Sequence, residues 1–379
     1  MYRIKTLNKI SSAGLDLLDQ TRFQVGGEVE NEDGILVRSA PMHDYVFPEE
    51  LRAIARAGAG TNNIPIDRCS ENGIVVFNTP GANANAVKEL VLAALLIASR
   101  DILGGAEWVQ EQVHTPGVDL AAAVEKGKSA FAGPELYRKT LGVIGLGAIG
   151  ALVCNIALEL GMDVYGYDPF LSVEAALRLD RHVHVVKNVD ELYRVSDYIT
   201  IHIPYNNSTK DFINAESIAK MKDGVVFLNF ARDKLVNDAD MLAALESGKV
   251  KKYVTDFPND AVIGKEGVIA TPHLGASSAE AEDNCAVMAA DEIMDYLENG
   301  NIVNSVNMPA CTLGPKKGTR IAVISKADAG ALEKVAAIAD GDVINKTRGD
   351  YAYTLAETSG DVDAAALEGE GIIRVRILK

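Results

Sequence analysis

The feature that most constrains the fold of this chain is an apolar strand that runs directly into a glycine-rich turn and then into a helix. Residues 141–150 are LGVIGLGAIG, so Gly145, Gly147 and Gly150 form the pattern G-x-G-x-x-G. The first glycine permits a tight turn, the second lets the backbone approach a pyrophosphate, and the third lets the helix pack against the strand. Free N–H groups at the start of such a helix face phosphates, so the pattern predicts a dinucleotide site.

An acidic residue completes this unit. A helix over residues 151–160, a stop at Gly161 and a strand over 163–167 lead to Asp168. Asp168 follows Gly150 at about the spacing of the carboxylate that accepts hydrogen bonds from an adenosine ribose. A carboxylate there repels a 2′-phosphate, so the sequence favours NAD over NADP. The structural alternative is a glycine-rich turn in another kind of α/β protein, with Asp168 only capping a strand.

Composition limits the remaining classes of protein. A chain of 379 residues is too long for one ordinary domain and suggests two or three. Its formal charge of −16 argues against nucleic acid or an anionic membrane as partner. The start of the chain lacks a signal-peptide pattern and its longest apolar run, residues 90–98, is too short to span a bilayer, so we expect a cytoplasmic protein. The four cysteines lie far apart, which indicates neither disulfides nor a metal site.

Short apolar runs alternate with helical patterns on both sides of the glycine turn, which predicts parallel α/β domains. In the first part of the chain we expect strands over 35–37 and 74–77, a helix over 48–57 and a long helix from Asn85 to about Leu103. Beyond the glycine turn we expect strands over 197–204, 224–230 and 252–256 and a helix over 278–299. Residues 312–319 have the composition of a linker and precede a β-α-β-β-α-β-like module, with a helix over 362–367 and a weakly marked strand near Val343.

Three polar residues follow predicted strands, where the carboxyl ends face the ligand crevice: Arg232, Asp260 and His273. Removal of hydride from a secondary alcohol needs a group that takes the hydroxyl proton, and the imidazole of His273 suits this role. Asp260 could fix its tautomer and stabilise the imidazolium. Arg232 could bind a substrate carboxylate in fork geometry. Taken singly, each has a structural alternative as a capped loop residue, a turn residue or a surface charge.

The order of these residues around the glycine turn resembles the D-isomer-specific 2-hydroxyacid dehydrogenases. The matching segments are 37–40, 56–64, 139–142, 166–169, 202–204, 229–232 and 272–275, and the resemblance covers essentially the first 307 residues. It implies a Rossmann NAD-binding domain, residues 92–274, inserted in a flavodoxin-like substrate domain formed by residues 1–91 and 275–307. It also implies dimerisation through the NAD domain, as a homodimer or homotetramer. Residues 318–379 resemble an α+β ACT domain, which in related enzymes binds amino acids between copies.

The resemblance implies oxidation of 3-phospho-D-glycerate to 3-phosphohydroxypyruvate with NAD, the first step of serine biosynthesis. It places cofactor contacts at Gly145, Gly147, Ala148, Ile149, Gly150, Asp168, His202, Pro204, Thr209, Ala231, Asp256, His273 and Gly275. It places substrate contacts at Arg38, Ser39, Ala59, Gly60, Arg232 and His273. Among these, Asp256 lies by the nicotinamide carboxamide, the N–H groups of Ala59 and Gly60 meet the substrate carboxylate, and Arg38 meets its phosphate.

The chain departs from the family pattern at two places. Asp260 stands where the family usually has a glutamate, in a segment one residue shorter, and Asp233 replaces the glycine after Arg232. The loop over 325–330 lacks the His and Asn of the serine-sensing pattern, which leaves inhibition by serine open. Two other functions remain open: a dehydrogenase for another small D-2-hydroxyacid, with Arg38 an ordinary surface charge, and an NAD-sensing protein that mainly binds partners.

Overall fold

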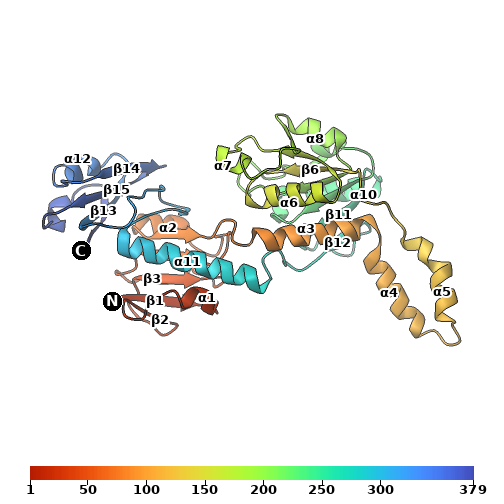
Figure 1. Cartoon of the computed structure of the whole chain (residues 1–379), viewed down its shortest axis with the longest axis horizontal. Coiled ribbons are helices and arrows are strands. Elements are labelled where there is room, and N and C mark those ends of the chain that lie inside the picture. The colour runs from red at the N-terminus through yellow and green to blue at the C-terminus, as the bar shows by residue number, and fades with distance from the viewer. The chain divides into compact units, whose positions relative to one another are not determined.

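The chain forms two compact units, and the second is inserted in the first (Figure 1). The computed structural model describes residues 1–379 with the exception of the side chain of Glu174. The first unit consists of Met1–Asn83 and Ser278–Lys379, and the second of Ala84–Ser277. The chain therefore passes between the units twice, near residues 83 and 277, and the module after the linker belongs to the same unit as the N-terminal residues.

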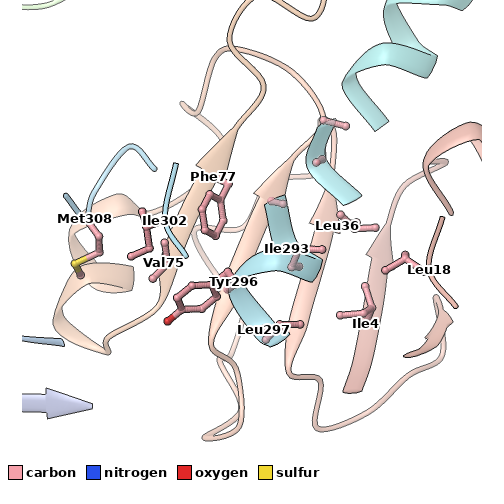
Figure 2. Close-up of a cluster of buried hydrophobic side chains, with 14 of the residues drawn as sticks. Ile4, Leu18, Leu36, Val75, Phe77, Ile293, Tyr296, Leu297, Ile302 and Met308 are labelled. Carbon is pink, nitrogen blue, oxygen red and sulfur yellow. The ribbon is translucent and has the colours of Figure 1, made fainter. Parts of the chain in front are cut away.

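A parallel sheet in the order β2-β1-β3-β4-β5 is the centre of the first unit. Its strands are β1 (Tyr2–Leu7), β2 (Phe23–Gly26), β3 (Gly34–Val37), β4 (Ala53–Arg56) and β5 (Val75–Asn78). This is the flavodoxin-like order, as predicted. The accompanying helices are α1 (Ser12–Leu15), α2 (Ile66–Glu71) and α11 (Ala279–Asn299). Figure 2 shows Ile293, Tyr296 and Leu297 of α11 in the core with Leu36 and Phe77 of the strands.

The helix predicted over residues 48–57 is wrong, because Ala53–Arg56 is strand β4. Ala53, Ile54 and Ala55 are fully buried, so both faces of the strand are apolar until Arg56 at its end. A short apolar run of this kind cannot be told from a buried helix by periodicity. The helix of this region lies further on, as α2.

The second unit is built on a seven-stranded parallel sheet in the order β12-β11-β10-β9-β6-β7-β8. Its strands are β6 (Thr140–Ile144), β7 (Asp163–Tyr167), β8 (His184–Val186), β9 (Tyr198–Ile201), β10 (Val225–Asn229), β11 (Val250–Thr255) and β12 (Val268–Ala270). The order reverses at β6, whose neighbours are β7 and β9, and ligands bind at such a switch point. The predicted Rossmann architecture is therefore confirmed.

Helices flank this sheet and one pair projects from it. They are α3 (Ala84–Ser99), α4 (Ile102–Val113), α5 (Leu120–Gly127), α6 (Ala148–Glu159), α7 (Val173–Ala176), α8 (Val189–Val195), α9 (Ala215–Ala219) and α10 (Asp238–Glu246), with 3-10 turns Lys128–Phe131 and Asp233–Leu235. The helix expected to reach Leu103 ends at Ser99, and α4 starts after Asp101, whose side chain accepts a hydrogen bond from the Gly104 N–H. Helices α4 and α5 extend away from the sheet as an arm (Figure 1) and contain no buried residue.

The C-terminal module is an antiparallel sheet in the order β14-β15-β13-β16, consistent with an ACT-like domain. Its elements are β13 (Thr319–Lys326), α12 (Ala331–Ala336), β14 (Val343–Arg348), β15 (Tyr351–Thr358), a 3-10 turn (Ala364–Leu367) and β16 (Ile372–Leu378). The helix expected over 362–367 is therefore only a 3-10 turn. Ala322, Ile324, Tyr353 and Leu355 of this sheet belong to the same core as Tyr296 of α11.

Buried guanidinium groups of the module cap the carboxyl end of α11. Arg376 donates to the carbonyl oxygens of Tyr296 (3.2 Å) and Leu297 (2.8 Å), and Arg320 donates to that of Asn299 (2.8 Å). The last carbonyls of a helix have no partner within it, and cations are stabilising there. The module is thus fastened to α11 by polar contacts as well as by the shared core. In the part of the chain that the structure describes, no helix combines the length and apolar character needed to cross a membrane.

Candidate functional site

The turn between β6 and α6 contains three glycines. At two of them the packing of the protein leaves no room for a side chain, and at the third it does. Gly145 has a φ of 92°, and a Cβ there would lie 2.6 Å from the carbonyl oxygen of His202. A Cβ on Gly150 would lie 1.9 Å from the carbonyl oxygen of Gly145. A Cβ on Gly147 would meet nothing within 4 Å. The absence of a side chain at Gly147 therefore leaves open space at the turn, as a bound pyrophosphate requires.

The start of α6 is open to a ligand. Gly147 is the N-cap residue and no side chain caps the helix, so the N–H groups of Ala148 and Ile149 are available at its N-terminus. These N–H groups and the helix dipole favour an anion. The geometry fits the phosphates of a dinucleotide.

Asp168 lies beside the same turn, directly after β7. Its Oδ2 accepts a hydrogen bond from the N–H of Leu146 (3.0 Å), and its Oδ1 accepts one from the N–H of Phe170 (2.9 Å). These two bonds hold the carboxylate against the glycine turn. This is the position from which a carboxylate binds the ribose of NAD.

The end of β9 borders the switch point from the other side. The N–H of His202 donates to the carbonyl oxygen of Ile144 at the end of β6 (2.7 Å), and the ring Nε2 is 3.0 Å from the hydroxyl of Thr200. Burial lowers the pKa of His202 to about 3, so its ring is neutral. Thr209 donates to the carbonyl oxygen of Pro204 (2.8 Å) and closes the following loop. His202 thus lies beside the end of β6 and the glycine turn, and Pro204 and Thr209 lie in the loop that follows it.

The neighbouring strands β10, β11 and β12 are each followed by a polar residue: Arg232, Asp256 and His273, respectively. The ring of His273 lies against that of Phe257, with 4.5 Å between centroids. The guanidinium carbon of Arg232 is 5.9 Å from the same ring centroid. Phe257 therefore contacts both predicted catalytic side chains and brings them to one place. Phe257 was not predicted from the sequence, where the available signal was its position directly after Asp256 at a strand end.

Asp256 is almost fully buried behind this group, with 1% of its surface exposed. Its Oδ2 accepts a hydrogen bond from the N–H of Gly275 (3.0 Å), and its Oδ1 is buried without a partner among the described residues. Burial raises the pKa of Asp256, and the neighbouring side chains of His273 and Arg232 oppose that rise. An acceptor without a donor in a buried place is what a ligand amide would complete.

Asp260 is exposed, and among the described residues no hydrogen bond or ion pair joins it to His273. The loop that carries it is held through Asn259, whose amide donates to Asp238 (3.0 Å). The backbone N–H of Ala231 donates to the Asn229 side chain (3.1 Å), which shapes the turn that precedes Arg232.

The predicted substrate residues of the first unit lie at the carboxyl edge of its own parallel sheet. Arg38 follows β3 and forms an ion pair with Glu282 of α11 (2.8 Å). Arg56 ends the neighbouring strand β4, and its Nε donates to the carbonyl oxygen of Arg38 (3.1 Å). Arg56 is a second residue that the sequence analysis missed, although it begins one of the segments that carry the family resemblance. Two guanidinium groups at adjacent strand ends favour an anion.

Backbone groups at the same edge add to this. The N–H groups of Ala59 and Gly60 donate to no protein acceptor in the described part of the chain, while the carbonyl oxygen of Ala59 accepts from Asn78 (2.6 Å). Successive free N–H groups of this kind can hold an anion. Ser39 is fixed differently, because its N–H donates to Asn8 (3.2 Å).

Comparison with known proteins agrees with this geometry. Residues 92–275 match the family described as D-isomer specific 2-hydroxyacid dehydrogenase, NAD binding domain. A hydroxypyruvate reductase of Thermotoga maritima is 38% identical over 277 residues, which cover 70% of this chain and 85% of that protein. The chain belongs to the D-isomer-specific 2-hydroxyacid dehydrogenase family. The predicted resemblance is confirmed, and so is NAD as the cofactor of its Rossmann domain.

Other members of the D-isomer-specific 2-hydroxyacid dehydrogenase family match over a larger part of this chain. D-3-phosphoglycerate dehydrogenase of Bacillus subtilis is 32% identical over 331 residues, 82% of this chain and 60% of that protein. The structure of NAD+-bound 3-phosphoglycerate dehydrogenase from Entamoeba histolytica has a TM-score of 0.63 and 26% identity, and covers 81% of this chain and 98% of that one. This family member thus spans only about three fifths of the Bacillus relative's length.

Proposed function

We propose that this chain oxidises 3-phospho-D-glycerate to 3-phosphohydroxypyruvate with NAD, the step that begins serine biosynthesis. The observation that carries the proposal is the convergence of Arg232, His273 and Asp256 at the ends of three neighbouring strands of the NAD-binding sheet. The names of the Bacillus and Entamoeba relatives support the choice of substrate.

The chemistry divides between the cofactor and the side chains. When bound, NAD would supply the acceptor for the hydride that leaves the carbon bearing the hydroxyl group. A ring nitrogen of His273 takes the proton from that hydroxyl, so the alcohol becomes a carbonyl as both leave. Arg232 binds the substrate carboxylate in fork geometry and polarises the developing carbonyl oxygen. Asp256 accepts a hydrogen bond from the nicotinamide carboxamide at its free Oδ1.

The role that we propose for Asp260 requires a change in the conformation of its loop. We assign it to the second ring nitrogen of His273, where it fixes the tautomer. The loop after Asp256 would have to bring the exposed carboxylate to the ring. An Asp260→Asn variant that keeps full turnover would remove this role.

Recognition of the phosphate is proposed for Arg38, with Arg56 beside it. Both are guanidinium groups at the carboxyl ends of paired strands, and Ser39 follows Arg38 directly. The free N–H groups of Ala59 and Gly60 are assigned to the substrate carboxylate. Glu282 neutralises part of the charge of Arg38, so the phosphate competes with this carboxylate for the same guanidinium.

A second substrate class has its own support. The Thermotoga relative of 38% identity is named for hydroxypyruvate, which carries no phosphate. The ion pair with Glu282 would leave Arg38 without a role in binding such a substrate.

Steady-state NADH oxidation with a panel of keto acids distinguishes the phosphorylated from the unphosphorylated substrate class. The panel is phosphohydroxypyruvate, hydroxypyruvate, pyruvate and glyoxylate. For phosphohydroxypyruvate we expect kcat/KM to exceed that for hydroxypyruvate about tenfold or more, because charge-assisted hydrogen bonds to phosphate contribute at least ~1.5 kcal/mol. Equal values for the two would refute the phosphate assignment. NADH binding without any turnover would indicate a binding protein.

The proposed assembly is a homodimer, or a homotetramer made of two. The α4–α5 arm of the NAD-binding unit supports this, because it contains no buried residue and exposes Ile102, Leu103, Val113 and Leu120. Light scattering after gel filtration measures the mass, and a monomer would contradict the assignment. An amino-acid effector at the C-terminal module is proposed as well, and added serine in the turnover assay tests the first candidate.

A further inference from the structure

A cavity of about 550 Å³ lies along one side of α11, within the first unit. Ten residues line it, six of them from the helix and four from two loops: Gly81, Ala82, Asn284, Val287, Met288, Asp291, Glu292, Asp295, Val303 and Asn304. None of them belongs to the residues assigned above to cofactor or substrate. Cavities of this size hold small molecules.

The lining carries negative charge and no positive charge. Asp291, Glu292 and Asp295 bring three carboxyl groups, while no lysine, arginine or histidine is among the lining residues. Asp295 is already occupied, because its Oδ1 accepts from the amides of Asn299 (2.8 Å) and Asn301 (2.9 Å). Asp291 and Glu292 bring the other two carboxyl groups of the lining.

Glu292 is the lining residue with a buried oxygen that lacks a hydrogen-bond partner among the described residues. Only 9% of this residue is exposed, its Oε1 accepts from the Asn304 amide (2.7 Å), and its Oε2 is buried without a partner in the described part of the chain. A buried polar atom without a partner is costly, and a buried charge without a counterion more so. Burial raises the pKa of Glu292 to about 8, and the negative charge of Asp291 on the same helix adds to the rise.

The remaining wall restricts the kind of cation. Val287, Met288 and Val303 supply apolar surface. Among the described residues no group of three His, Cys, Asp or Glu side chains could hold a metal ion. A cationic group attached to an apolar body fits both the carboxyl groups and the apolar wall of this cavity.

We propose that this cavity binds a small organic cation, an ammonium or guanidinium group on a short aliphatic stem, with the cationic group on Glu292 and the stem against Val287, Met288 and Val303.

The proposal predicts a proton release that a purely apolar cavity would not give. At pH 7 the carboxyl group of Glu292 is largely protonated in the free protein, and Asp291 and Asp295 are the other titratable groups that line the cavity. A cation at Oε2 favours the ionised form, so binding drives the proton off. The released fraction falls as the pH is raised above about 8, where Glu292 is already ionised.

Titration calorimetry of the full chain with n-butylamine tests this, with 1-butanol as the uncharged ligand of matched stem. We expect one butylamine per chain and no heat from butanol at the same concentrations. Measurements at pH 7 in phosphate and in HEPES, which differ in ionisation enthalpy, should give heats that differ by the release of a substantial fraction of one proton.

Variants complete the test. Glu292→Gln keeps the size of the side chain and an acceptor for Asn304, and we expect it to weaken butylamine binding about tenfold or more and to abolish the proton release. Glu280→Gln removes the same charge from the exposed first turn of α11, outside the cavity, and should change binding less than about twofold. Asp291→Asn should lie between the two. Equal affinity of Glu292→Gln and wild type, equal binding of butanol and butylamine, or no binding of butylamine would each overturn the proposal.

Discussion

Asp256 and Glu292 are two buried carboxyl groups with opposite neighbours. Each has one oxygen that accepts a hydrogen bond and one that is buried without a partner among the residues that the structure describes. Burial raises the pKa of both. Beside Asp256 lie the basic side chains of His273 and Arg232, whereas beside Glu292 lies the carboxyl group of Asp291. The comparison shows that neighbouring basic side chains oppose the rise in pKa that burial causes, whereas a neighbouring carboxylate adds to it.

The largest effect is expected from removal of the imidazole. His273→Ala should lower kcat about 10²- to 10⁴-fold, the usual contribution of a positioned acid or base, with little change in NADH affinity. Steady-state kinetics and NADH fluorescence measure the two quantities. His182→Ala, an exposed histidine paired with Asp180, is the control and should keep full turnover. If His273→Ala keeps near-full turnover, the proposed mechanism is wrong.

A smaller effect is expected from Asp256→Asn. The variant keeps an oxygen at the end of the side chain but loses the charge, and an amide can turn its NH2 group toward the nicotinamide. We expect the KM for NADH to rise about tenfold, the worth of one hydrogen bond to a charged group. Asp163→Asn, at the exposed start of β7, removes the same charge elsewhere in the sheet as a control. An unchanged KM for NADH would show that the buried oxygen has no part in cofactor binding.

Glu292 predicts how stability depends on pH. Its pKa is about 8 in the folded chain against 4.5 in the unfolded one, so the folded state holds a proton that the unfolded state has lost. Its contribution to stability is complete below about pH 4.5 and declines as the pH rises toward 8. The free energy of unfolding of wild type relative to Glu292→Gln should therefore fall by at least ~1 kcal/mol between pH 5 and pH 8.

Urea unfolding at a series of pH values measures this difference. A difference that stays constant over the range would show that Glu292 is already ionised at pH 5. Comparison with Asp256→Asn sharpens the contrast, because the cations beside Asp256 reduce the rise of its pKa and so the slope over the same range.

The smallest effect concerns the charge next to Arg232. Asp233→Gly restores the glycine usual in the family and removes a half-exposed negative charge beside the guanidinium. Exposed charge interactions are worth less than ~1 kcal/mol, so kcat/KM should rise about two- to threefold. The same substitution at Asp223, an exposed residue that pairs with Lys249, is the control. A fall in kcat/KM would indicate that Asp233 holds Arg232 in place.

The sequence predicted what local patterns determine. The glycine turn, Asp168 and the strands that end before Arg232 and Asp256 depend on neighbours in the chain, and the structure has them where the pattern indicated. Strand β4 was missed because its apolar run is buried on both faces. Phe257 and Arg56 were missed because their importance lies in contacts with residues from other strands.

Glu292 lies in a helix that the sequence predicted correctly, between residues that reach the core. Its burial comes from the loop that carries Asn304, and no periodicity within the helix indicates this. The contact between Asp260 and His273 remains a prediction. The segment that carries Asp260 is one residue shorter than in the family, so the family pattern does not indicate the loop conformation that this contact requires.

The arginine caps at the carboxyl end of α11 bear on how the last sixty or so residues can be handled experimentally. Arg320 and Arg376 donate hydrogen bonds to carbonyl oxygens that have no partner inside the helix. Ile324 and Leu355 belong to the same hydrophobic core as this helix. Deleting the module would strip these partners from a helix whose other end bears Glu282, the residue paired with Arg38. Truncation is therefore a perturbation of the substrate-binding half of the molecule, and a shortened chain is no substitute for an effector-free one.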